Sequence, residues 1–384
     1  MRVMTSQEWL AQLVAFDTTS RYSNLVLIDC VESYLSDEGF ATRRSYNEAG
    51  DKANLFATIP AKNGERQRGT ILSGHTDVVP VAGQQWDTDP FSATTIKDRI
   101  YGRGTCDMKG FIAVVLSLIP ELKPVLTKPL HLAFSYDEEV GCLGAPKLIA
   151  DFKAEGIRPE ACIVGEPTDM RPVVAHKGIN VFRCQFNGYA VHSSLVSSGC
   201  NAIEYAAELI SWIRNLAGLL KLGPHDKHYD VPFSSISTNQ IRGGNALNTV
   251  PAQCEFFFEL RNLPAVDPEK IIDQIKDYIN HNLLPKMKSE YEHASIELSS
   301  IAAVPGHEAS EESAITRLAR SLTNNKDIFK VAYATEGGMF EAAGIPTVIC
   351  GPGNIQQAHG PNEYVEISQL KQCEIFLRQL ALQH

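Results

Sequence analysis

Histidine and carboxylate side chains recur at the ends of apolar runs and in glycine-rich loops of this chain. They are His75, Asp77, Asp107, Glu138, Glu139, Glu166 and His359. Imidazole and carboxylate groups without thiolates are the ligands of open catalytic zinc sites. A carboxylate beside such a site can transfer protons. The residue types therefore predict metal-assisted chemistry, provided that the fold brings them together.

His75 is the first candidate ligand, because it ends the buried apolar run 70–75. Side chains two residues apart in an extended chain share a face, so Asp77 is expected to lie beside it. A carboxylate behind a liganding imidazole is a common arrangement that orients the ring. The alternative is a strand-end histidine that bonds to a nearby turn.

Asp107 lies in a segment with glycines at 102, 104 and 110, directly before the apolar run 111–119. Glycine allows backbone conformations that other residues resist, so the segment predicts a tight connection that enters a helix. Asp107 can be a ligand there. It can also be a simple N-terminal cap of that helix.

Three acids, Asp137, Glu138 and Glu139, end the apolar run 129–136. Carboxylates this close repel one another unless cations lie between them, which favours a metal site. The alternative is a solvated acidic turn. Glu166 follows the apolar run 161–165 in the same way.

The elements that must position these residues alternate between strand and helix. Strands are expected at 54–60, 70–75, 129–136 and 161–165, and helices at 5–14, 24–38, 111–119 and 143–155. Thr5 and Glu8 form a capping-box pattern for the first helix. Residues 80–101 are rich in Gly, Pro and Asp and predict an ordered loop. This order predicts an α/β fold with a mostly parallel sheet, whose strands carry the site at their carboxyl ends.

The order of the expected strands and helices changes after Gly178. Strands are expected at 179–187, 234–242, 253–261 and 294–302, and helices at 201–216 and 268–284. That βαββαβ order is the ferredoxin-like pattern and predicts an inserted domain. The earlier alternation of strands and helices then resumes, with helices at 310–322 and 367–382, strands at 329–333 and 346–350, and a turn at 336–338. The predicted domains are 1–178 with 304–384, and 179–303.

Composition excludes several classes of protein. A formal net charge of −10 and the lack of a Lys/Arg cluster argue against nucleic-acid binding. The nine cysteines are scattered without a Cys-x-x-Cys pair, so we expect no disulfide framework and a reducing cytoplasm. The longest apolar run, 111–119, is too short to cross a membrane. No membrane partner is therefore expected.

Five motifs in order resemble the di-zinc aminoacylase and carboxypeptidase family. They are Ser-Gly-His75-Thr-Asp77, Tyr-Gly-Arg-Gly-Thr-Cys-Asp107-Met-Lys-Gly, Asp-Glu138-Glu139, Gly-Glu166-Pro-Thr and Ala-His359-Gly-Pro-Asn-Glu. Within that family, the segments 171–178, 188–194 and 334–336 are most similar to the acetylornithine deacetylase group.

The resemblance implies two Zn²⁺ ions, for which Co²⁺ is expected to substitute. Asp107 would bridge them, with His75 and Glu166 on one ion and Glu139 and His359 on the other. Glu138 would then be the general base that activates water and later protonates the leaving amine. The resemblance also implies a cis peptide bond between Asp107 and Met108.

The inserted domain resembles the lid and dimerisation domain of the family, which implies a homodimer. His192 matches a histidine that stabilises the oxyanion in the partner's site, and its alternative is a capped strand end. Asn248 and Arg261 match lid positions that hold the substrate carboxylate, and the alternative for Arg261 is an interdomain ion pair. Glu336 lies in a segment of the acetylornithine deacetylase group and is a further candidate for substrate binding.

The implied reaction is amide hydrolysis of a small N-acyl amino acid, with N-acetyl-L-ornithine first among the substrates. Acetylcitrulline, succinyl-diaminopimelate, and dipeptides or other N-acyl amino acids remain alternatives. A non-catalytic protein on the same scaffold is the alternative of another class. The presence of every metal ligand and of Glu138 argues against it.

Overall fold

The predicted alternation of strands and helices forms a nine-stranded sheet with the order β1-β2-β6-β3-β7-β15-β8-β13, and β14 pairs with β8. The computed structural model describes residues 3–383. The four central strands, β6, β3, β7 and β15, run parallel to one another. Antiparallel pairs flank them, for example β1 with β2. The mostly parallel α/β fold expected from the sequence is therefore confirmed.

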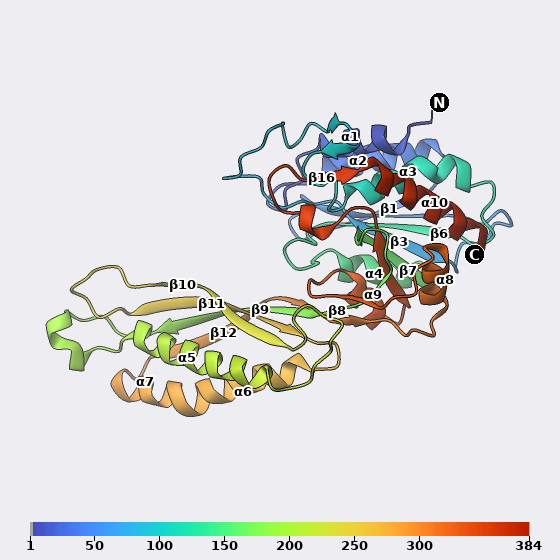
Figure 1. Cartoon of the computed structure of the whole chain (residues 1–384). Helices are drawn as coiled ribbons and strands as arrows, with labels where there is room; N and C mark the ends of the chain where they lie inside the picture. The colour runs from blue at the N-terminus through green and yellow to red at the C-terminus, as the bar shows by residue number, and fades with distance from the viewer. Residues whose placement is uncertain (1–2, 384) are drawn as a thin grey trace. The chain divides into compact units, whose positions relative to one another are not determined.

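The strands of this sheet are β1 Thr42–Tyr46, β2 Ala53–Ile59, β3 Thr70–His75, β6 Leu130–Ser135, β7 Ala161–Pro167, β8 Val173–His176, β13 His307–Glu308, β14 Phe329–Val331 and β15 Thr347–Gly351. Its helices are α1 Ser6–Val14, α2 Leu25–Asp37, α3 Lys109–Leu122, α4 Ala145–Ala154, α8 Ala314–Leu322, α9 Gly337–Ala342 and α10 Ile367–Gln383. Helices α1, α2, α3 and α10 lie on one face of the sheet, and α4 and α9 lie on the other (Figure 1). A parallel sheet covered on both faces has buried strands, which explains the continuous apolar runs.

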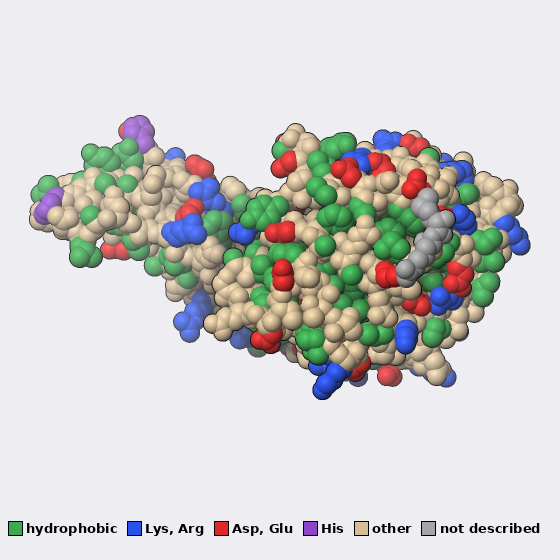
Figure 2. Space-filling model, turned by 90° about the horizontal axis from the view of Figure 1, so that it is seen from above, with side chains coloured by type: hydrophobic (Ala, Val, Ile, Leu, Met, Phe, Trp, Pro, Cys, Tyr) green, Lys and Arg blue, Asp and Glu red, His purple; other side chains and the backbone are tan. Residues whose placement is uncertain are grey.

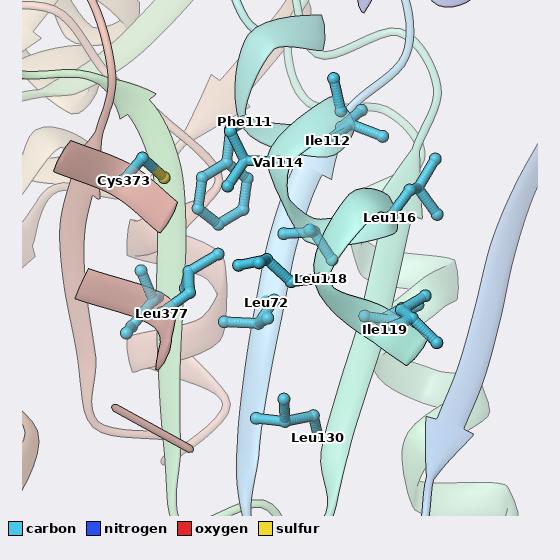
Figure 3. Close-up of a cluster of buried hydrophobic side chains, with 14 of the residues drawn as sticks. Leu72, Phe111, Ile112, Val114, Leu116, Leu118, Ile119, Leu130, Cys373 and Leu377 are labelled. Atoms are coloured by element: carbon cyan, nitrogen blue, oxygen red, sulfur yellow. The ribbon is translucent and has the colours of Figure 1, made fainter. Parts of the chain in front are cut away.

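Helix α3 is the centre of the core, and residues on all its sides are buried. Figure 3 shows Phe111 and Val114 of α3 near Leu72 of β3 and Cys373 of α10. A Cβ atom at Gly165 in β7 would lie only 2.0 Å from Cγ of Phe111, so only glycine fits at that position. The close approach of β7 to α3 fixes the end of the strand that carries Glu166.

Two local expectations were wrong, and several strands were not predicted. Residues 80–101, expected as a loop, contain β4 Thr94–Ile96 and β5 Arg99–Tyr101, which form a small sheet with β16 Tyr364–Glu366. The expected turn at 336–338 includes the start of α9. Strand β1 was not predicted. Strands β1, β4 and β5 are partly exposed, so they lack the apolar runs that identify buried strands.

A second compact unit comprises His176–Gly306 with Val331–Ala334, and the first comprises Met1–Ala175, His307–Lys330 and Thr335–His384. The second has a four-stranded sheet of order β10-β11-β9-β12 in which every pair is antiparallel. This is the ferredoxin-like arrangement of a βαββαβ chain, as expected. Its elements are β9 Gly178–Asn187, α5 Ala202–Leu220, β10 Ser235–Gly243, β11 Gln253–Asn262, α6 Pro268–Tyr278, a π-helical turn Ile279–Leu283, α7 Leu284–Glu290 and β12 Ser295–Val304.

Alternate residues of β9 and β11 are buried, because helices α5 and α6 cover one face of this sheet (Figure 1). All nine cysteines are free thiols. Figure 2 shows acidic and basic side chains interspersed over the face it draws. Among the residues the structure describes, no helix is both long and apolar enough to cross a membrane.

Candidate metal centre

The site lies where three neighbouring parallel strands end. His75 is the last residue of β3, Glu138 and Glu139 follow the end of β6, and Glu166 is the penultimate residue of β7. Because β3 lies between β6 and β7, their carboxyl ends meet at one edge of the sheet. The sequence-predicted residues of the first unit are therefore brought together.

Asp107 is at the centre of the cluster and contacts both histidines. Its Oδ1 lies 3.0 Å from Nε2 of His75, and its Oδ2 lies 3.2 Å from Nε2 of His359. The same His359 nitrogen is 3.1 Å from Oε2 of Glu139. The peptide bond between Asp107 and Met108 is cis, as the family resemblance implied. One carboxylate between two imidazoles is the arrangement expected if Asp107 bridges two ions.

Two overlapping groups of ligand atoms share His75. The first joins His75, Asp107 and Glu139, and the second joins His75, Glu138 and Glu166, with the atoms of each group within 4.8 Å of one another. In the second group, Nε2 of His75 lies 3.7 Å from Oε1 of Glu166. Both groups are compact enough to hold an ion. They differ from the expected ligand sets, in which Glu138 is the base and Glu139 shares an ion with His359.

The electrostatics of the cluster favour a bound cation. Burial raises the pKa of Glu138 and of Glu166 well above the usual value, and burial together with nearby Asp107 raises the pKa of Glu139 to about 7. Burial would also raise the pKa of Asp107, but hydrogen bonds with His359 and His75 lower it. Hydrogen bonds to Asp107 and Glu139 raise the pKa of His359 to about 10. Without metal, the cluster therefore retains protons to limit its negative charge.

The donor set fits divalent metal ions. All of these residues offer imidazole nitrogen or carboxylate oxygen, which suits Zn²⁺ in a catalytic site. In the part of the chain that the structure describes, Oε1 of Glu139 is buried and has no hydrogen-bond partner. A buried acceptor without a donor is costly, and a cation would satisfy it.

Asp77 lies beside His75, but its contacts differ from the expected ones. Nδ1 of His75 donates to the main-chain oxygen of Asp77 at 3.0 Å, while the nearer carboxylate oxygen is 3.5 Å away. That carboxylate accepts hydrogen bonds from the main-chain N–H groups of Glu138, at 3.0 Å, and Glu139, at 3.3 Å. Asp77 therefore links the His75 ring to the backbone that carries the two glutamates.

Ser20 is a site residue that the sequence did not indicate. Its hydroxyl donates to Oδ2 of Asp77 at 2.7 Å, and both side chains are buried. The run Asp17-Thr-Thr-Ser20 has no motif that points to the site. Only the fold places it there, because the main chains of Ser20 and Val78 are hydrogen bonded.

Glu336 is buried, with 1% of its surface exposed, at the start of α9. Ser73 of β3 donates to its Oε2 at 3.0 Å. Burial raises its pKa, which the nearby imidazole of His75 and the hydrogen bond from Ser73 partly offset. The side chain therefore lies among buried strand residues, and its role in substrate binding stays a prediction.

His192, Asn248 and Arg261 belong to the second unit. His192 and Asn248 are both exposed and lie on neighbouring segments, because the N–H of Ser193 donates to the carbonyl of Asn248 at 2.9 Å. Arg261 pairs with Glu259 on its own strand and donates to the carbonyl of Ala332 at 3.2 Å. Their functional roles stay predictions.

Comparison with known proteins agrees with the geometry. The sequence profile of peptidase family M20/M25/M40 matches residues 71–383. The chain is 34% identical to an acetylornithine deacetylase of Pasteurella multocida (strain Pm70) over 348 residues, covering 89% of this chain and 87% of the relative.

Two solved structures share the fold. An M20 family metallo-carboxypeptidase from Sulfolobus solfataricus superimposes with a TM-score of 0.75 at 18% identity, covering 99% of each chain. A dinuclear metal-binding peptidase of the M20 family from Bacillus subtilis superimposes with a TM-score of 0.67 at 13% identity, covering 98% of each chain. At these identities the likeness establishes the fold.

Proposed function

We propose that this chain, which belongs to peptidase family M20/M25/M40, is a cytoplasmic di-zinc enzyme that hydrolyses N-acetyl-L-ornithine to L-ornithine and acetate, a step of arginine biosynthesis. The observation that carries the proposal is the Asp107 carboxylate between the imidazoles of His75 and His359. The substrate is supported by the relative from Pasteurella multocida that is named acetylornithine deacetylase, at 34% identity over most of the chain.

The metal ligands proposed are Asp107 as the bridge, His75 and Glu166 for one ion, and Glu139 and His359 for the other. The peptidase of Bacillus subtilis that shares the fold is described as dinuclear, which supports a two-ion site. Zn²⁺ suits the donor set, and Co²⁺ is expected to substitute. When bound, the pair would supply Lewis acidity that activates water and polarises the amide carbonyl.

Glu138 is the proposed general base. It takes a proton from the attacking water and later delivers it to the nitrogen of the departing amine. Hydrogen bonds from its own main-chain N–H and that of Glu139 to Asp77 hold the segment in place. The thiol of Cys142 donates to Oε1 of Glu138 at 3.5 Å.

His192 is the proposed oxyanion donor, acting in the active site of the partner subunit of a homodimer formed through the second unit. Its Nδ1 accepts the main-chain N–H of Ser194 at 3.2 Å. In the neutral ring the proton is then on Nε2, which leaves an N–H donor on an exposed side chain. Asn248 and Arg261 are proposed to bind the substrate carboxylate, and Glu336 is a third proposed substrate-binding residue.

Replacement of His192 by alanine should lower kcat by about 10²–10³-fold and leave metal content unchanged, because one oxyanion donor is worth about 3–4 kcal/mol. Mixing His192→Ala subunits with Glu138→Gln subunits tests whether the histidine acts across the interface. One site of each heterodimer would have both an intact base and an intact donor, so about half of the wild-type activity per heterodimer should return. If subunits exchange and no activity returns, His192 does not act in the partner's site.

The substrate is tested with a panel of N-acyl amino acids and dipeptides on the zinc-loaded protein. We expect kcat/KM to be highest for N-acetyl-L-ornithine, by about 10–100-fold over each competitor, because each selective contact contributes about 1–3 kcal/mol. The informative competitors are N-acetyl-L-citrulline, succinyl-diaminopimelate and simple dipeptides. A higher kcat/KM for any of them would assign the chain to that activity instead.

A further inference from the structure

A buried ion pair connects two segments that carry proposed metal ligands. Nη1 of Arg103 lies 2.6 Å from Oε2 of Glu363, and each side chain is only 1% exposed. Arg103 precedes Asp107 by four residues, and Glu363 follows His359 by four. Both residues lie within the sequence motifs that identify the site, yet neither contacts substrate or metal in the proposed mechanism.

Glu363 holds the backbone at Asp107. Its other oxygen, Oε1, accepts the main-chain N–H of Cys106 at 2.9 Å and that of Asp107 at 3.1 Å. The carbonyl of Glu363 accepts the N–H of Gly102 at 2.9 Å. The segment from 102 to 107 is therefore fixed to residue 363 at both ends.

Arg103 holds the backbone at His359. Its Nη2 donates to Oε1 of Gln84 at 2.8 Å, and Nε2 of Gln84 donates to the carbonyl of His359 at 2.7 Å. Nη2 of Arg103 also lies 3.4 Å from that carbonyl. The guanidinium therefore reaches His359 both directly and through Gln84.

His359 needs such support more than the other ligands do. Its side chain is 53% exposed, whereas that of His75 is 1% exposed. Its backbone has φ of 62°, a left-handed conformation that residues with side chains rarely adopt. Little packing holds the His359 ring, so apart from its contacts with Asp107 and Glu139 its position depends on the hydrogen bonds to its loop.

We propose that Arg103, Glu363 and Gln84 are positioning residues that set the distance between Asp107 and His359 and so determine the affinity of the ion that His359 binds. The inference rests on the proposed two-ion site. Partners behind metal ligands typically contribute 10–100-fold to metal affinity. Arg103 is suited to this role because its planar guanidinium donates hydrogen bonds to Glu363 and Gln84 at the same time, which the single ammonium group of a lysine cannot reproduce.

The test is a zinc titration of the metal-free protein against a competing chromophoric chelator. Glu363→Gln and Arg103→Lys should each bind one ion about 10–100-fold more weakly than the wild type does. Gln84→Ala, at a partly exposed position, removes the uncharged link between Arg103 and His359, together with a hydrogen bond from Nε1 of Trp86, and should weaken the same ion by about 10-fold. Excess Zn²⁺ should then restore the activity of Gln84→Ala, which a general loss of folding would not allow.

Arg99→Gln is the matched control. Arg99 pairs with Glu366 across β5 and β16, close in sequence to Arg103 and Glu363, but the pair is more than one third exposed and the two side chains lie 3.4 Å apart. This variant should keep wild-type affinity for both ions. The inference is overturned if Gln84→Ala and the folded ion-pair variants bind both ions within about threefold of wild type, or if Arg99→Gln weakens binding equally. A wild-type protein that binds no zinc would refute the proposed function itself.

Discussion

Removal of divalent metal should abolish amide hydrolysis, and added Zn²⁺ or Co²⁺ should restore it. In the metal-free cluster, burial and nearby Asp107 raise the pKa of Glu139 to about 7, and burial raises the pKa of Glu166 well above its usual value. The protons that these carboxyl groups hold cannot replace the ions, and without the ions the site has no Lewis acid to activate water and polarise the amide carbonyl. We therefore expect activity to fall to the level of the uncatalysed reaction after dialysis against a strong chelator.

The measurement pairs the assay with elemental analysis of the same sample. Two equivalents of Zn²⁺ per chain should be needed for full recovery if both proposed positions are used. A circular dichroism spectrum before and after chelation controls for loss of the fold. Residual zinc-bound protein could account for some remaining activity, so the zinc content should be below about 0.1 equivalents per chain. Full activity at that zinc content would refute metal catalysis.

The substitution Glu138→Gln should lower kcat by about 10²–10⁴-fold or more while both ions remain bound. The amide has nearly the same shape as the carboxyl group, but it cannot accept the proton of the attacking water. Glu138 would also serve twice, first as base and then as acid. The effect should appear in kcat more than in KM, because the proton transfers occur in the transition states.

Glu139→Gln is the matched comparison, because Glu139 is the adjacent residue and a proposed ligand. Its carboxylate lies 3.1 Å from His359, so its loss should weaken metal binding as well as activity. Zinc content by elemental analysis separates the two variants. If Glu138→Gln loses metal, or if it keeps wild-type kcat, the base must be assigned to another residue.

Periodicity in the sequence predicted most of the fold, for a clear physical reason. Strands β3, β6 and β7 are buried along their whole length, and their residues form continuous apolar runs. The alternation of buried residues in β9 identified the second unit's sheet in the same way. The short strands β4 and β5 were missed, because three partly exposed residues carry no periodic signal.

The sequence also determined which residue types meet at the site. Motifs around His75, Asp107, Glu139, Glu166 and His359 lie at the ends of strands or in loops, and the parallel order of β6, β3 and β7 makes those ends coincide. Local sequence could indicate this much, because each strand and its terminal residue are contiguous in the chain.

Only the tertiary structure decided how these ligands are held. The partners of Asp77 include Ser20, 57 residues away, and Arg103 meets Glu363 across 260 residues. Neither local propensity nor periodicity encodes such contacts, since they form when the packed sheet and helices bring distant loops together. Residue types and strand ends are local properties of the chain, whereas the hydrogen-bond partners of a buried group depend on which distant segments the fold brings next to it.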